Sequence, residues 1–324
     1  MSRFIVGFIV CLALIPPASS FAADAPWPTQ PVRLVVPGDA GGVLDIRARW
    51  LADRLTPLLG RSVIVDNRVG AGGAIGTEAG AKSPPDGHTL TLIHLGTMAI
   101  NPHLYARLGY DPLADFAPIT QISGGPVLLV VHSAVPVGQL VELVRLAKAQ
   151  PGQMNFGSGG IGTPGHLAAE LFKRMAGIDV VHVPYKGGAQ AVASLLAGQT
   201  TFMTESPSVL LQHIRSGRLR ALAVTGAVRL KSLPDVPTVA EAGLAELEFV
   251  AWTGLAAPAG TPKPIVERLY REIRDLMKTP AAAEWLEMIG SYPRSDSPDE
   301  FARSIRADHA RWGKIIRDAG IRLE

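Results

Sequence analysis

The 324-residue sequence has few cysteines, few charges and few long apolar runs, and each shortage excludes a class of protein. Its single cysteine is Cys11. Charged residues make up 18 % of the chain, the formal net charge is +3, and no five basic residues stand together, so a nucleic-acid-binding surface is not expected. After the N-terminal segment there is no apolar run of about 18 residues, the length that a membrane-spanning helix needs.

The N-terminal segment 1–22 is typical of a cleaved signal peptide. Arg3 precedes an apolar run over 4–15, and small residues stand at −3 and −1 of a cleavage after Ala22, with the next alanine as an alternative. An uncleaved anchor is the other interpretation, although the run is short for a bilayer. Cleavage would remove Cys11, so the mature protein would form no disulfide, thiol nucleophile or thiolate metal site. We therefore expect a protein exported to the periplasm.

Short apolar stretches alternate with amphipathic ones along the rest of the chain. The stretch 32–36 predicts a strand, and the spacing of apolar residues in 45–59 predicts a helix. Further strands are expected at 62–65, 89–93, 126–131, 154–156, 180–183, 200–203 and 219–224, and an apolar run lies around 249–256. Further helices are expected at 74–82, 137–149, 163–175, 189–196, 207–216, 264–278, 281–289 and 298–319. This alternation predicts an α/β fold in which mostly parallel sheets carry helices on both faces. Ligands of such sheets bind in the loops where strands end and helices begin.

The first loop of interest is 37–45, between the first strand and the first helix. Gly41 and Gly42 would let backbone N–H groups approach an anion without obstruction by Cβ atoms. Asp45 has two interpretations: it caps the helix, or it orients a polar group in the pocket. Val43 and Leu44 lie between them.

The second loop of interest is 157–166. Gly159 and Gly160 would present N–H groups to an anion at a helix N-terminus, with Thr163 as the N-cap. A tight turn without a ligand is the alternative. The loop also matches G-x-G-x-x-G, but Asp179 stands at the wrong end of the next strand to bind a ribose, which argues against a dinucleotide.

Other residues offer weaker indications of a site. His166, one turn into its helix, reaches the cleft or packs inside. Thr97 offers a hydroxyl or caps a helix, Tyr185 would wall the pocket, and Lys186 pairs with an anion or is solvated. The eight histidines contain no H-E-x-x-H, and no nucleophile elbow or P-loop occurs, so we expect no cofactor and no metal.

Ordered motifs spread from Trp27 to Glu324 resemble one family. They are Trp27-Pro28-x-x-Pro31-Val32-Arg33-Leu34-Val35-Val36-Pro37, Val65-Asp66-Asn67-Arg68-x-Gly70-Ala71-Gly72-Gly73-x-Ile75-Gly76, Pro84-Pro85-Asp86-Gly87-His88-Thr89-Leu90, Asn101-Pro102-x-Leu104-Tyr105, Tyr110-Asp111-Pro112-x-x-Asp115-Phe116, Gly162-Thr163-Pro164-x-His166-Leu167-Ala168, His182-Val183-Pro184-Tyr185-Lys186-Gly187, Leu219-Arg220-Ala221-Leu222-Ala223-Val224-Thr225, Leu233-Pro234-Asp235-Val236-Pro237-Thr238 and Ala257-Pro258-Ala259-Gly260-Thr261-Pro262. The chain resembles the Bug-type (TctC-like) periplasmic solute receptors of tripartite tricarboxylate transporters.

The resemblance implies a two-lobed periplasmic-binding-protein fold with a cleft for a small organic carboxylate. We divide the mature chain into a discontinuous first lobe, 23–124 plus 226–324, and a second lobe, 125–225. In relatives backbone groups of two Gly-rich loops hold a carboxylate, which maps onto 41–45 and 159–163 here. The implied partners are the permease subunits, and a monomer is expected.

Two departures from the family pattern bear on the ligand. Val43 and Leu44 replace the third glycine and the hydroxyl residue usual in the first loop, and Glu205 would place a negative charge near the cleft or point outward. A citrate-like ligand therefore fits the sequence poorly. Three other functions stay open: a receptor for a two-component sensor, an exported hydrolase that pairs Ser158 with His166, and a carrier for an ATP-driven transporter.

Overall fold

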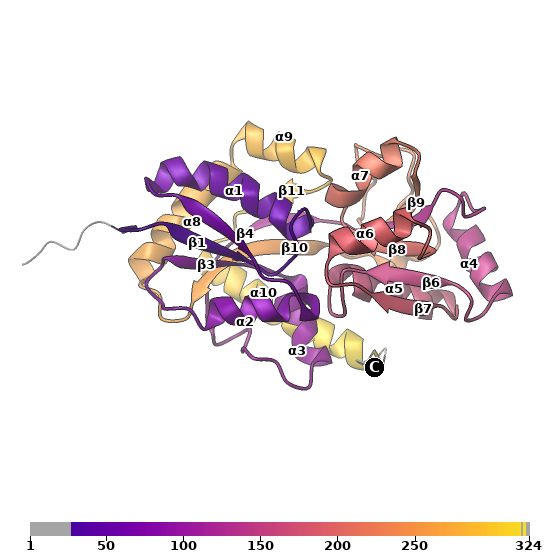
Figure 1. The fold of residues 1–324 in the computed structure, drawn as a ribbon, viewed down its shortest axis with the longest axis horizontal. Coiled ribbons are helices and arrows are strands. Elements are labelled where there is room, and N and C mark those ends of the chain that lie inside the picture. The colour runs from indigo at the N-terminus through magenta and orange to yellow at the C-terminus, as the bar shows by residue number, and fades with distance from the viewer. Residues whose placement is uncertain (1–26, 319, 322–324) are drawn as a thin grey trace, which may run out of the picture.

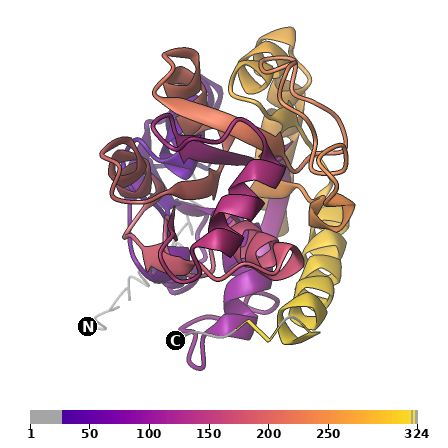
Figure 2. The same ribbon diagram turned by 90° about the vertical axis from the view of Figure 1, so that its right-hand side faces the viewer.

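The computed structural model describes residues 27–318 and 320–321, and its chain forms two lobes side by side (Figure 1). The predicted signal peptide 1–22 lies outside these residues. Within them no helix is both long and apolar enough to cross a membrane. Figure 2 looks along the long axis from the second-lobe end, with the first lobe behind.

The first lobe is built on a six-stranded sheet in the order β11-β4-β10-β3-β1-β2. Its elements are β1 (Val32–Val36), α1 (Val43–Leu59), β2 (Val63–Asn67), η1 (Ala71–Gly73), α2 (Ala74–Ala81), β3 (Thr89–His94), η2 (Gly96–Ile100), α3 (Asn101–Leu104), β4 (Phe116–Gly125), β10 (Ala251–Pro258), α8 (Lys263–Met277), α9 (Pro280–Met288), β11 (Tyr292–Pro293) and α10 (Pro298–Asp318).

Side chains alternate between the two faces of this sheet, as the pleat of a strand requires. Leu90 and Leu92 join a core with α1, α8 and α9, whereas Ile93 joins a second core with η2, α3 and α10. Because helices cover both faces, the central strands are apolar on both sides, which is why the sequence shows runs rather than strict alternation there.

The second lobe is built on a five-stranded sheet in the order β7-β6-β8-β5-β9. Its elements are β5 (Leu128–His132), α4 (Leu140–Ala149), β6 (Asn155–Ser158), α5 (Pro164–Ala176), β7 (Val181–Pro184), α6 (Gly188–Leu196), β8 (Phe202–Glu205), α7 (Pro207–Arg215) and β9 (Leu219–Val224). One core lies between the sheet and α4 and α5, and the other lies under α6 and α7.

The two-lobed α/β fold confirms the prediction, but the sheets are mixed rather than mostly parallel. β1, β2 and β3 pair in parallel, and so do β6, β7 and β8. The antiparallel pairs are β10 with β3 and β4 and β11 with β4 in the first sheet, and β5 with β8 and β9 in the second. β10 and β5 adjoin segments that pass between the lobes, so each enters its sheet from the partner lobe and runs against its neighbours. The sequence analysis also missed β4.

Segments that pass between the lobes meet at one buried threonine, Thr225. Its hydroxyl accepts a hydrogen bond from the Val127 N–H at 3.0 Å and donates to the Phe249 carbonyl at 2.9 Å, while the Phe249 N–H donates to its carbonyl at 3.0 Å. The outgoing segment after β4 and the returning segment before β10 are therefore tied together between the two lobes.

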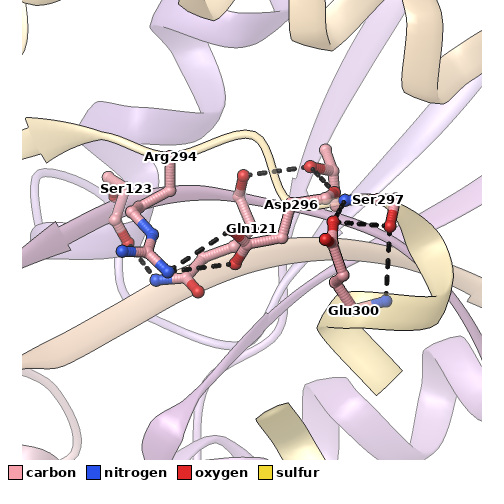
Figure 3. A network of polar contacts seen from close by, with 7 residues as sticks. Gln121, Ser123, Arg294, Asp296, Ser297 and Glu300 are labelled. Carbon is pink, nitrogen blue, oxygen red and sulfur yellow. Dashed lines mark hydrogen bonds and ion pairs between the residues drawn. The ribbon is translucent and has the colours of Figure 1, made fainter. Parts of the chain in front are cut away.

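A polar network fixes the edge of the first sheet to the last helix (Figure 3). The Arg294 N–H donates to the Ile122 carbonyl, and its guanidinium pairs with Asp296 at 3.3 Å. Ser297 and Glu300 then form reciprocal hydrogen bonds at the start of α10, the arrangement of a capping box. The network holds β4, which carries Ser123 to the site described below.

Phe301 provides a test of how α10 is held on the sheet. Its ring is fully buried and meets Trp252 edge-on at 5.3 Å, in a space that Gly254 leaves open because a Cβ there would lie 2.3 Å from the ring. We predict that Phe301→Ala lowers the free energy of unfolding in urea by about 3–5 kcal/mol. The exposed Arg303→Ala on the same helix should change it by less than about 0.5 kcal/mol. A loss below about 1 kcal/mol for Phe301→Ala would contradict this packing.

Candidate functional site

A cavity of about 110 Å³ lies between the lobes, a size that suits a compact ligand. Both lobes and the segments that join them line it. The lining residues on which the site depends are Asp39, Val43, Leu44, Arg47, His94, Ser123, Gly159, Thr163, Lys186, Glu205, Trp252 and Thr253.

Backbone atoms of the two lobes approach each other closely beside this cavity. A Cβ on Gly72 would lie 2.0 Å from the carbonyl oxygen of Ile161 in the opposite lobe, and Gly72 has a positive φ of 58°. A Cβ on Gly162 would lie 1.8 Å from Oδ1 of Asn101, whose Nδ2 donates to the Gly72 carbonyl. Tyr105 adds a hydrogen bond from its hydroxyl to the Ile161 carbonyl at 3.2 Å. Only glycine at 72 and 162 allows this approach.

Arg47 places a buried positive charge on the first-lobe wall. Its guanidinium donates to Ser123 Oγ at 3.1 Å, to the Val43 carbonyl at 2.9 Å and to Ser291 Oγ at 2.8 Å. A guanidinium has five N–H groups, so two of them have no hydrogen-bond partner among the described residues. Burial lowers the pKa of Arg47 to about 10, and the group stays charged at neutral pH. All three partners are neutral oxygens, which leaves the cation suited to an anionic ligand.

His94, at the end of β3, adds a neutral donor to the same wall. Its Nδ1 accepts a hydrogen bond from the Gly96 N–H at 3.1 Å. Burial lowers the pKa of His94 to about 4, so the ring is neutral at pH 7. A neutral ring whose Nδ1 accepts must carry its proton on Nε2, which makes Nε2 a donor beside the cavity.

Glu205, at the end of β8, places a carboxyl group on the second-lobe wall. The side chain is 9 % exposed, and its Oε1 accepts a hydrogen bond from the Ser206 N–H at 2.7 Å. Its Oε2 lies 3.3 Å from the position that a Cβ on Gly188 would take, at the start of α6. Burial, with a smaller contribution from Asp39, raises the pKa of Glu205 to about 7, while the Ser206 N–H and Arg47 oppose the rise.

Asp39 reaches from the first lobe to the second. Its Oδ2 accepts a hydrogen bond from the Ala189 N–H at 2.9 Å, in the first turn of α6. The helix begins at Gly188 after Gly187, and neither glycine has a side chain to cap it, so Asp39 caps it from the opposite lobe. A Cβ on Gly187 would lie 2.2 Å from Cγ of Asp39, which explains the glycine.

Five of the predicted site residues line the cavity. They are Val43, Leu44, Gly159, Thr163 and Glu205. Thr163 is also the N-cap of α5, as predicted, since its Oγ1 accepts a hydrogen bond from the His166 N–H. The residues that depart from the family pattern therefore line the cavity from both lobes: Val43 and Leu44 from the first, and Glu205 from the second.

The remaining backbone donors predicted for the first loop are used within the loop itself. The Gly41 N–H donates to Asp45 Oδ2 at 2.9 Å, and the Gly42 N–H donates to the Asp39 carbonyl at 3.1 Å. Helix α1 begins at Val43 with Gly42 as its N-cap, so Asp45 is not the cap; it lies in the first turn and pairs with Arg49 at 2.9 Å.

In the second loop and nearby, four further predicted residues lie off the cavity wall. The Gly160 N–H donates to Ser158 Oγ, and the Tyr185 hydroxyl bonds Ser194. The Thr97 hydroxyl donates to the His94 carbonyl at 3.2 Å rather than entering the cleft. His166 packs inside: its Nδ1 accepts from the Gly162 N–H, and its ring lies 4.5 Å from that of His182.

Ser158 is paired with a different histidine from the one that a hydrolase was expected to use. Its Oγ lies 2.7 Å from Nε2 of His182, not beside His166. Ser158 is 1 % exposed and does not line the cavity, and its Oγ already accepts the Gly160 N–H. The pair therefore fastens the end of β6 to β7.

Three residues of the cavity wall were not predicted from the sequence: Arg47, Asp39 and His94. Arg47 stands four and eight residues before the buried Leu51 and Leu55, so an arginine occupies the apolar face of a helix, and that signal was available. His94 ends a strand, but Thr97 was predicted as the site residue of this segment. No local pattern marks Asp39, because its partner is 150 residues away.

A small cavity between two α/β lobes, with a buried cation on one wall and glycine loops closing over it, defines a two-lobed solute-binding protein. A family model described as "Tripartite tricarboxylate transporter family receptor" matches residues 47–321. The chain belongs to this family, and the Bug-type (TctC-like) resemblance is confirmed. It is a solute-binding receptor.

Three solved structures show how closely the fold is shared. "R. palustris Rpa4515 with adipate" is 37 % identical, with a TM-score of 0.89 over 92 % of this chain and 100 % of that one. "Structure of periplasmic binding protein BugD" is 33 % identical, with a TM-score of 0.88 over 92 % and 100 %. "MatC (Rpa3494) from Rhodopseudomonas palustris with bound malate" is 30 % identical, with a TM-score of 0.86 over 90 % and 100 %.

The buried His94 makes folding stability depend on pH. Its pKa is about 4 in the folded protein and about 6.5 when exposed, so the unfolded chain binds more protons between these values and stability falls as the pH falls through them. We predict that His94 contributes about 2 kcal/mol to the loss of unfolding free energy between pH 7.5 and pH 5. In His94→Asn, whose Oδ1 can replace Nδ1, urea unfolding should show a smaller loss over this interval. An equal loss in both proteins would contradict the assignment.

Proposed function

We propose that this protein captures a small organic carboxylate between its lobes and delivers it to the permease subunits of a tripartite transporter. The observation that carries the proposal is Arg47, which lines the cavity and whose buried guanidinium has two N–H groups without a hydrogen-bond partner among the described residues. Hydrogen bonds to a charged group contribute about 1.5–3 kcal/mol each, so two of them plus apolar contacts with Leu44 reach the roughly −8 kcal/mol of micromolar binding.

Related proteins support the carboxylate as the ligand class. The structure titles name adipate for Rpa4515 and malate for MatC, and BugD is named as a periplasmic binding protein. By extension, we propose a periplasmic monomer that binds and releases its ligand without chemical change. The position of Ser158 away from the cavity fits this proposal better than the hydrolase alternative.

Binding would be coupled to the closing of the lobes. A ligand stabilises the closed form only to the extent that it binds that form more tightly than the open one. The cavity wall combines Arg47 of the first lobe with Gly159 and Thr163 of the second, so a ligand that touches both walls has this preference. We propose the segments joined at Thr225 as the place of the bend. Val239 and Leu247 pack in the core of the second lobe, so that lobe extends beyond the boundary expected at 225/226.

Calorimetry with a panel of organic acids tests the proposed function directly. We expect heat and a raised melting temperature with at least one small carboxylate, at micromolar affinity. If no acid gave either a binding heat or a raised melting temperature, the proposal would be refuted.

Substitution of Arg47 tests the observation that carries the proposal. We predict that Arg47→Met weakens binding of the acid found above by about a hundredfold, and that Arg47→Lys, which keeps the charge and loses the planar fork, weakens it by about tenfold. Arg54→Met, on the same helix with its guanidinium over Trp50, is the matched control and should leave affinity unchanged. Melting curves verify that each variant is folded. Unchanged affinity in folded Arg47→Met would contradict the role of Arg47.

A further inference from the structure

Glu205 is the buried acidic group of the cavity that the proposed function does not use. One oxygen, Oε1, is occupied by the Ser206 N–H, and Oε2 has no hydrogen-bond partner within residues 27–318 and 320–321. The side chain is 9 % exposed and lines the cavity. Because Glu205 lines the cavity, Oε2 can accept a hydrogen bond from a donor group of a bound ligand.

Asp39 makes the same part of the cavity wall doubly acidic. It lines the cavity and lies close enough to Glu205 to raise the pKa of that group. Both carboxyl groups adjoin the first turn of α6: Asp39 Oδ2 binds the Ala189 N–H, and Glu205 Oε2 lies beside Gly188. The protein therefore already places its own carboxyl groups at the helix N-terminus where a second carboxylate of a ligand would otherwise be favoured.

The two walls of the cavity therefore differ in hydrogen bonding: the first lobe offers donors, and the second lobe offers an acceptor. Arg47 and the Nε2 of His94 donate from the first lobe, whereas Glu205 accepts from the second. Lys186 lines the cavity on the second-lobe side, but its side chain is exposed to water. A ligand with a carboxylate at both ends would bring one of them against Glu205 and Asp39, and like charges repel strongly in a buried site.

We propose, on the basis of the proposed function, that Glu205 selects the ligand by accepting a hydrogen bond from its second end. The site thus prefers a monocarboxylate that bears a terminal amino or hydroxyl group over a dicarboxylate of the same length. The carboxylate faces Arg47, and the terminal donor faces Glu205 Oε2. This preference differs from that of the relatives whose titles name adipate and malate.

The charged groups that face Glu205 set how this preference changes with pH. Asp39 faces it from the loop before α1, and Arg47 faces it from α1 itself. Because the pKa of Glu205 is raised to about 7, the group is ionised at pH 8 and largely protonated at pH 6. Protonated Glu205 can donate to a carboxylate, so dicarboxylate binding should tighten as the pH falls, and binding of an amino-bearing acid should weaken.

Calorimetry on the full mature chain tests the inference with four ligand series of matched length, from three to six carbons: ω-amino acids, ω-hydroxy acids, unsubstituted monocarboxylates and dicarboxylates. At pH 8 the best amino or hydroxy acid should bind at least tenfold more tightly than the dicarboxylate of its length. Glu205→Gln should reduce that advantage to about threefold or less. Glu267→Gln, the same change on the exposed face of α8, should leave it intact.

The pH series on the unmodified protein gives a second test that needs no variant. Dicarboxylate affinity should rise severalfold from pH 8 to pH 6, and Glu205→Gln should remove the dependence. A dicarboxylate that binds as tightly as the donor-bearing acids at pH 8, or a preference that Glu205→Gln leaves unchanged, would overturn the inference while the proposed function stands. If no acid gave a binding heat, the proposed function would be refuted, and the inference with it.

Discussion

The close approach of backbone to backbone between Gly72 and Ile161 is the constraint on which the site depends. Side chains at this junction would hold the lobes apart, since a Cβ at Gly72 or Gly162 would fall within 2.0 Å of an oxygen of the opposite lobe. With glycine there, the second-lobe loop packs against the first lobe, and the Tyr105 hydroxyl donates a hydrogen bond to the Ile161 carbonyl of that loop. The walls that carry Arg47 and Glu205 then face one cavity.

The electrostatics of the cavity follow from that closeness. Each buried charge has neutral hydrogen-bond partners on its own lobe: serine hydroxyls and a carbonyl for Arg47, and a backbone N–H for Glu205. These partners orient the groups without cancelling their charges, so attraction and repulsion remain for a guest molecule. Burial shifts the pKa of Glu205 upward and that of His94 downward, which fixes one as a titrating acceptor and the other as a neutral donor.

Most helices and strands could be predicted from the sequence, but their pairing into sheets could not. Apolar spacing located α1 and β1 to within two residues, because local propensity and burial agree there. β4 was missed because Pro118 and the glycines at 124 and 125 obscure its pattern, and its place is set by pairing with β10, far along the chain. In the site, glycine spacing located both loops, but the pattern does not show that Asp45 takes the Gly41 N–H or that Asp39 reaches α6.

Trp252 is an intrinsic fluorophore next to the cavity. It is one of the residues that line the cavity and is 7 % exposed, and its Nε1 donates to Asp308 at 2.7 Å, which fixes the orientation of the indole. Fluorescence of a buried, immobilised indole responds to polarity at its face, and a guest that displaces solvent from the cavity alters that polarity. Occupancy can therefore be followed by emission from the native chain, without any attached dye.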